Sequence, residues 1–125
     1  LKTTVSYVAD QGTLAKYYSA ADLLLYPSIA DNCPLVALET QACGLPLVAF
    51  KTGGIPEIVD HKKTGYIAEY KNMDDLIRGV GYILALNIYE TEYMKNNAIK
   101  KINDNFTLNI MADNYINLYK KLLKI

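Results

Sequence analysis

Several features that mark whole classes of protein are scarce or missing in this chain of 125 residues. The 13 basic residues are balanced by 13 acidic ones, so no charge excess favours a nucleic-acid partner. No apolar run approaches the roughly 20 residues that span a bilayer, and no signal-peptide pattern opens the sequence. Two cysteines, Cys33 and Cys43, make neither a disulfide framework nor a metal site. We therefore expect neither a nucleic-acid-binding protein nor a metalloprotein.

The sequence does contain enough apolar residues for one folded domain. Hydrophobic residues make up 51% of the chain, which supports a real core at this length. The chain opens at Leu1 in what resembles the approach to a strand, so we expect it to be a piece of a longer protein. Its single histidine, His61, lies in a polar turn, where we expect it to be solvated.

Short apolar runs alternate with helical patterns along the chain. The strands expected from these runs cover 5–8, 23–26, 46–50 and 65–68. The helices expected cover 12–20, 34–43, a short segment from about 56 to 60, and most of 73–125 with breaks near 87 and at 103–107. In the last helix we expect the apolar residues to be buried: Ile110, Met111, Tyr115, Leu118 and Leu122. This alternation predicts an α/β fold, a Rossmann-like parallel sheet flanked by helices, and the run at 23–26 should be buried on both faces.

Two acids eight residues apart, Asp31 and Glu39, are the most informative pair. Pro34 suits the first turn of a helix that Gly44 ends. On that helix Glu39 falls on the apolar side, with Thr40 and Gln41 marking the polar side. A buried carboxylate needs a partner or a wet cleft, so we expect both acids to face one cleft. The helix pattern alone leaves open that the helix is turned and Glu39 is merely solvated.

Two loops follow strands of the expected parallel sheet, at 28–33 and at 51–55. Ligands bind such sheets outside the carboxyl ends of the strands. Each loop runs into a helix N-terminus, whose free N–H groups favour an anion. Gly53 and Gly54 would let the backbone approach a ligand closely, although the pair taken alone favours an ordinary tight turn over phosphate binding.

Six segments occur in an order and spacing typical of one enzyme family. They are Leu14-x-x-Tyr17-Tyr18-x-x-Ala21-Asp22, Pro27-Ser28-x-x-Asp31 through Glu39, Ala42-Cys43-Gly44-Leu45-Pro46, Gly53-Gly54-Ile55-Pro56-Glu57-Ile58-Val59, Thr64-Gly65-Tyr66, and Phe106-Thr107 before Tyr115-x-x-Leu118-Tyr119. Together they resemble the C-terminal half of a GT-B glycosyltransferase of the retaining family 4, also called group 1. The resemblance implies that 1–125 is a nucleotide-sugar-binding domain.

The resemblance also implies roles for individual residues. Glu39 would bind the ribose hydroxyls of the donor nucleotide, and Asp31 would lie near the transferred sugar as a catalytic residue. The other donor-binding residues implied are Asn32, Cys33, Pro34, Leu35, Val36, Gly53 and Gly54. The reaction implied is retaining transfer from a nucleoside-diphosphate sugar to an acceptor hydroxyl. Neither a metal nor another cofactor is expected.

The sequence departs from the family pattern in three places. Asp31 is one methylene shorter than the usual glutamate, and Asn32-Cys33-Pro34 replaces a common glycine-aromatic-glycine. Such variants are similar to a branch linked to surface polysaccharides. Tyr7 stands where a glycine is common. The upstream glycine loop and the N-terminal acceptor domain lie outside these residues, so we expect the chain alone to transfer no sugar.

Other readings remain open. A domain that kept this fold could serve only nucleotide binding or protein interaction. A phosphoreceiver domain fits poorly, because Asp10 and Asp22 do not supply its acidic pair. For the enzyme we expect a cytoplasmic location, with an acceptor sugar or lipid-linked glycan bound through the N-terminal domain. Lysines near the end of the chain would allow peripheral contact with an anionic inner membrane face: Lys120, Lys121 and Lys124.

Overall fold

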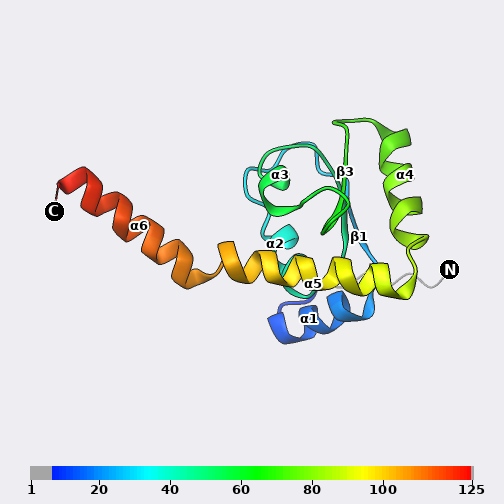
Figure 1. The fold of residues 1–125 in the computed structure, drawn as a ribbon, viewed down its shortest axis with the longest axis horizontal. Coiled ribbons are helices and arrows are strands. Elements are labelled where there is room, and N and C mark those ends of the chain that lie inside the picture. Colours follow the sequence, from blue (N-terminus) through cyan, green and yellow to red (C-terminus); the bar gives the residue numbers. More distant parts are fainter. Residues whose placement is uncertain (1–6, 125) are drawn as a thin grey trace.

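A parallel sheet flanked by helices forms the body of the protein, as the alternating pattern predicts (Figure 1). The computed structural model describes residues 7–124. In chain order its elements are α1 (Gln11–Ala20), β1 (Leu24–Tyr26), α2 (Leu35–Ala42), β2 (Leu47–Phe50), α3 (Ile55–Ile58), β3 (Gly65–Ala68), α4 (Met73–Leu84), α5 (Ile88–Asn105) and α6 (Leu108–Leu123). Of the strand expected over 5–8, residues 5 and 6 lie outside the described residues, and the expectation was wrong for Tyr7 and Val8, which belong to no strand.

The described sheet has the order β1-β2-β3, with both pairs parallel. Leu47 lies opposite Leu24 on one side and Gly65 on the other. Because β2 is the central strand, all four of its residues are buried. In β1 the side chain of Leu25 is 46% exposed, so the expectation that this run is buried on both faces was wrong. Within the described residues β1 is an edge strand that pairs with β2 only, so its other edge is not covered by a neighbouring strand.

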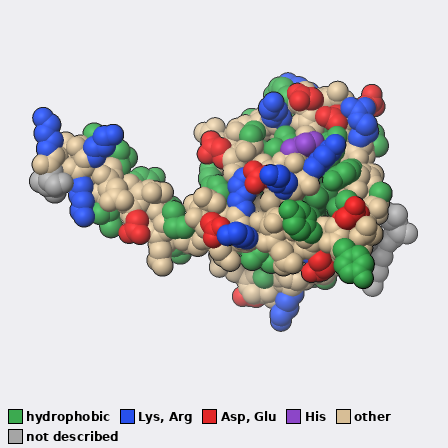
Figure 2. Space-filling model, in the orientation of Figure 1, with side chains coloured by type: hydrophobic (Ala, Val, Ile, Leu, Met, Phe, Trp, Pro, Cys, Tyr) green, Lys and Arg blue, Asp and Glu red, His purple; other side chains and the backbone are tan. Residues whose placement is uncertain are grey.

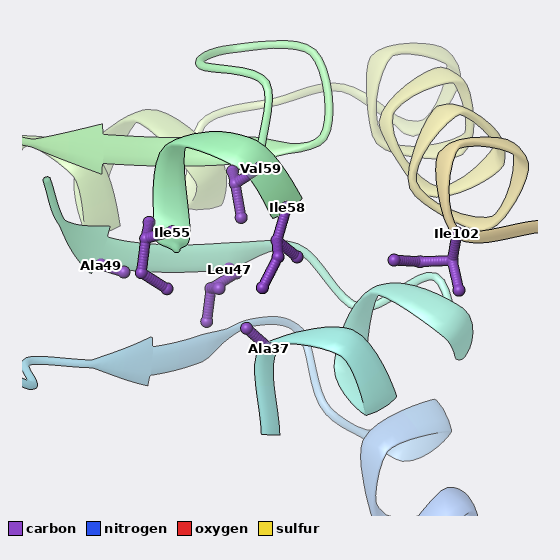
Figure 3. Close-up of a cluster of buried hydrophobic side chains, with 7 residues drawn as sticks. All are labelled: Ala37, Leu47, Ala49, Ile55, Ile58, Val59 and Ile102. Carbon is purple, nitrogen blue, oxygen red and sulfur yellow. The ribbon is translucent and has the colours of Figure 1, made fainter. Parts of the chain in front are cut away.

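Successive residues of β2 point to opposite faces of the sheet, and each face carries its own core cluster. Figure 3 shows the cluster on one face, formed by β2 with α2, α3 and α5: Ala37, Leu47, Ala49, Ile55, Ile58, Val59 and Ile102. The cluster on the other face lies mainly between the sheet and α4: Val48, Phe50, Tyr66, Ala68, Leu76, Ile83 and Met94. Both faces of the sheet are therefore covered by helices.

Asp75 fastens the start of α4 to β3. Its carboxylate accepts hydrogen bonds from the Tyr66 hydroxyl at 2.8 Å and from the Glu69 amide at 2.7 Å. Arg78 lies 3.3 Å from the same carboxylate. The Glu69 amide, the Tyr66 hydroxyl and Arg78 together hold the pKa of Asp75 below its usual value. The residue is only 8% exposed, so these partners compensate the loss of water.

The last helix, α6, projects away from the body, and none of its residues is buried (Figures 1 and 2). The expected burial of its apolar residues was therefore wrong. Ile110 is half-buried, and the others are 48–69% exposed: Met111, Tyr115, Leu118 and Leu122. The 3.6-residue periodicity identifies an apolar face, but it does not supply a surface to cover that face.

Candidate functional site

Two loops meet at the carboxyl edge of the sheet. Because β1 and β2 are parallel, the chain leaves both strands at the same edge. The Thr52 hydroxyl donates a hydrogen bond to the Ile29 carbonyl at 3.3 Å, which joins the two loops. The Tyr70 hydroxyl donates to the same carbonyl at 3.2 Å, from the segment that follows β3. The predicted loops at 28–33 and 51–55 therefore lie side by side.

Gly53 and Gly54 make this close approach possible. A Cβ atom on Gly53 would overlap the carbonyl oxygen of Asp31, and one on Gly54 would lie 2.5 Å from that of Asn32. Gly53 also has a φ of +47°, in the left-handed region that favours glycine. The glycines thus let one loop pack against the other. Their predicted contact with a donor stays a prediction.

The Asp31 side chain is held by the last residue of β1. The Tyr26 hydroxyl donates a hydrogen bond to the Asp31 Oδ2 atom at 2.7 Å. This bond, followed by burial, raises the pKa of the Tyr26 phenol, so the phenol stays protonated at neutral pH. Asp31 is half-buried at the loop surface. Sequence reasoning placed Tyr26 in an apolar run and missed this contact.

The segment after Asp31 leads into α2. Pro34 is the N-cap and its side chain offers no hydrogen bond to the helix, as expected of a residue without a polar group. Asn32, Cys33 and Leu35 are exposed, while Pro34 is buried and Val36 is half-buried. The first N–H groups of α2 therefore receive no side-chain cap, which leaves them available to an anion.

Helix α2 is turned relative to the expected orientation. Its buried residues are Ala37, Thr40 and Gln41, so the side marked as polar faces the core. The Thr40 hydroxyl donates to the Val36 carbonyl at 2.8 Å. The Gln41 Nε2 atom donates to the carbonyls of Leu45 at 3.1 Å and Thr64 at 3.0 Å. These bonds satisfy the donors of both side chains, whereas the Gln41 Oε1 atom is buried with no hydrogen-bond partner among residues 7–124.

Glu39 faces α1 instead of the core. It lines a pocket of about 230 Å³ between α1 and α2. The lining residues are Gln11, Leu14, Ala15, Tyr18, Glu39, Ala42 and Cys43. Burial and the nearby Glu39 carboxylate raise the pKa of the Tyr18 phenol, and the same two causes raise that of the Cys43 thiol. Glu39 is half-buried, so it is neither a core residue nor a fully solvated one.

The two acids contact different parts of the structure. Asp31 and Asn32 lie against Gly53 and Gly54, as the parallel topology predicts. The pocket that Glu39 lines includes none of those four residues, and the expectation that both acids face one cleft stays a prediction. Tyr18 joins Glu39 in its pocket. The sequence offers one signal for Tyr18, which is its place in the helix that leads into β1.

The remaining candidate features add no reactive group to the α1–α2 pocket or to the carboxyl edge of the sheet. His61 is exposed, as expected for its polar turn, and its Nδ1 atom accepts a hydrogen bond from the Ile67 amide at 3.1 Å. Within residues 7–124 no group of three or more potential metal ligands comes together. No helix in this range is both long and apolar enough to cross a membrane.

What the site can do follows from its two halves. The α1–α2 pocket offers apolar walls and one carboxylate, which suit a ring that carries paired hydroxyl groups. The carboxyl edge offers a second carboxylate beside the uncapped start of α2, which suits an anionic group linked to a polar one. Together they suit a ligand with an anionic centre and a hydroxyl-rich ring at either end.

Comparison with known proteins points the same way. The family profile described as "Glycosyl transferases group 1" matches residues 2–101. An uncharacterized glycosyltransferase of Methanocaldococcus jannaschii is 35% identical over 86% of the chain. A D-inositol 3-phosphate glycosyltransferase of Corynebacterium jeikeium is 36% identical over 87% of the chain. The chain spans 27% and 26% of these two relatives, so it corresponds to about a quarter of their length.

Solved structures share the fold. A sucrose-phosphate synthase of Thermosynechococcus elongatus superposes with a TM-score of 0.85 and 30% identity, over 98% of this chain and 30% of that one. HepE of Anabaena, solved in complex with UDP-glucose, superposes with a TM-score of 0.75. That match has 23% identity and covers 97% of this chain and 32% of HepE. At that identity the likeness shows the fold alone.

Proposed function

Because the chain belongs to the group 1 glycosyl transferases, we propose that it is the donor-binding part of a retaining glycosyltransferase. The enzyme moves a sugar from a nucleoside-diphosphate sugar to an acceptor hydroxyl. The observation that carries this proposal is the α1–α2 pocket, because it combines apolar walls with the single carboxylate of Glu39. A nucleoside requires that combination, because its flat ring needs apolar walls and its pair of ribose hydroxyls needs a carboxylate.

Glu39 binds the ribose in this proposal. An ionised carboxylate has two oxygens that accept hydrogen bonds, and the 2′- and 3′-hydroxyls of a ribose donate two. Leu14, Ala15 and Ala42 provide the apolar surface beside it. The UDP-glucose complex of Anabaena HepE supports a nucleotide sugar as the class of ligand, since the two proteins share a fold.

The diphosphate and the sugar lie toward the start of α2. The N–H groups of Leu35 and Val36 stabilise the negative charge that develops on the leaving diphosphate. Asp31 lies beside the transferred sugar and accepts a hydrogen bond from one of its hydroxyls. The loop of Gly53 and Gly54 packs against the backbone of Asp31. We expect this chemistry to need neither a metal nor another cofactor.

The acceptor binds outside these residues. The relatives are about four times as long as this chain, so most of such an enzyme lies beyond it. An acceptor sugar or a lipid-linked glycan in surface polysaccharide synthesis fits the Asp31-Asn32 variant of the family pattern. Such an enzyme acts in the cytoplasm. The chain alone transfers no sugar, because catalysis requires donor and acceptor to be held together.

The test is calorimetric titration of the chain with UDP, GDP and ADP, using Glu39→Gln and a matched control. Glu92→Gln changes an exposed glutamate on α5, outside the pocket. Glu39→Gln removes one charge while keeping the shape, so it should weaken binding of the preferred nucleotide by about 1–3 kcal/mol. Glu92→Gln should bind like the wild type. Equal affinity of all three proteins would refute the ribose role of Glu39.

A second assay separates a transferase from a binding domain. The complete gene product is incubated with a radiolabelled nucleotide sugar and an acceptor extract, beside the 125-residue chain. Transfer by the complete protein alone is the expected result. Transfer by the 125-residue chain would contradict the assignment of the acceptor site to the rest of the protein. Nucleotide binding without transfer by either protein would favour a non-catalytic domain.

A further inference from the structure

Asp31 is fixed at two points by different parts of the structure. Its backbone carbonyl packs against Gly53, where a Cβ atom could not fit. Its Oδ2 atom accepts the hydrogen bond of the Tyr26 hydroxyl at 2.7 Å. Within residues 7–124 its Oδ1 atom accepts no hydrogen bond. One carboxylate oxygen is therefore held, and the other is left for a ligand.

Tyr26 is well placed to hold a side chain still. It is the last residue of β1, and its backbone is paired with Ala49 of the central strand. Its ring packs against the core cluster shown in Figure 3. A donor carried by a paired strand is more precisely placed than one carried by a loop. The Asp31 loop thus receives its orientation from the sheet.

We propose that Tyr26 is a positioning residue, which holds the Asp31 carboxylate so that its Oδ1 atom meets the sugar of the donor. This inference rests on the proposed function and goes beyond it. It also accounts for the aspartate: the Tyr26 hydroxyl defines one place for the carboxylate, and that place is within reach of the shorter side chain. A glutamate at 31 would carry its carboxylate past the hydroxyl.

The test measures binding of the sugar separately from binding of the nucleotide. The complete gene product is first titrated with UDP-glucose, UDP-N-acetylglucosamine, UDP-galactose and GDP-mannose. The nucleotide sugar that binds most tightly, and the matching nucleoside diphosphate, are then titrated against variants. Tyr26→Phe removes only the hydroxyl. Tyr70→Phe is the matched control, because it removes a tyrosine hydrogen bond to the Ile29 carbonyl of the same loop and leaves Asp31 untouched.

Tyr26→Phe should weaken binding of the nucleotide sugar about tenfold and leave binding of the nucleoside diphosphate unchanged. Tyr70→Phe should leave the ratio of the two affinities as in the wild type. An equal loss for both ligands in Tyr26→Phe would assign the hydroxyl a structural role and overturn the proposal. No loss for either ligand would overturn it too. Because nucleotide binding reports the folded site, a misfolded variant is recognised in the same experiment.

A double-mutant cycle with Asp31→Glu gives a second, independent readout. If Tyr26 acts through Asp31, the two substitutions are non-additive, and Tyr26→Phe adds little once residue 31 is glutamate. Additive losses would contradict the proposal. If the wild type binds none of the four nucleotide sugars, the proposed function fails and this inference fails with it. If the wild type binds and Tyr26→Phe binds equally well, only this inference fails.

Discussion

Replacing Gly53 by alanine should destabilise the protein, because two physical effects act at this position in the same direction. The backbone φ of +47° is unfavourable for an alanine by about 1–2 kcal/mol. The new Cβ atom also overlaps the Asp31 carbonyl oxygen, so the two loops must move apart. Overpacking of this kind typically destabilises by about 1–3 kcal/mol. A stiffer unfolded chain offsets about 0.4–1 kcal/mol of the total.

The net expectation is a loss of about 1–4.6 kcal/mol in the free energy of unfolding, measured by urea denaturation of the 125-residue chain. Gly81→Ala provides a control of opposite sign. Gly81 lies in the interior of α4, and a Cβ atom there would meet nothing within 4 Å. Alanine should stabilise the helix by about 0.5–1 kcal/mol. If Gly53→Ala unfolds at the wild-type midpoint or above it, the packing of the two loops is not as described.

Three further predictions concern the rest of the protein. The native contacts of Asp75 lower its pKa from the unfolded value of 3.8, so its ionised carboxylate stabilises the fold above that pH. Stability should therefore fall as the pH drops through 3.8 toward the lowered pKa, and Asp75→Asn should flatten that profile in urea titrations. Leu118→Ser on α6 should change the unfolding free energy by less than about 0.5 kcal/mol, because the side chain is 48% exposed; a larger loss would mean that α6 packs on the body. Cys33 is exposed and should react with a thiol reagent faster than Cys43, whose thiol pKa is raised, and mass spectrometry after timed labelling would reveal the reverse order.

Local signals predicted where the elements begin and end. The strand expected at 65–68 is β3 without change, and the expected break near 87 separates α4 from α5. Asn87 marks this break because its side chain accepts hydrogen bonds from the amides of Tyr89 and Glu90, a capping box contained within four residues. Gly44 ends α2 with a φ of +72°, as its position after the helical pattern predicts.

Contacts between distant segments were harder to predict. Gln41 is polar, yet it is fully buried because it donates to the carbonyl of Thr64, 23 residues away. Hydropathy along α2 cannot include such a partner, and so the helix was expected with its opposite side inward. The same limit applies to Tyr26, whose hydrogen bond to Asp31 depends on how the loop after β1 folds back.

The sequence by itself determined the order of the elements, the parallel sheet, and the meeting of the Asp31 loop with Gly53 at its carboxyl edge. These follow from periodicity, helix caps and turns, which act between residues no more than a few positions apart, and from the rule that parallel strands end at one edge. Only the tertiary structure decided which face of α2 is buried, that Glu39 opens toward α1, and that the apolar face of α6 has no cover among the described residues. Burial depends on what lies opposite a side chain, and that partner comes from a remote part of the chain.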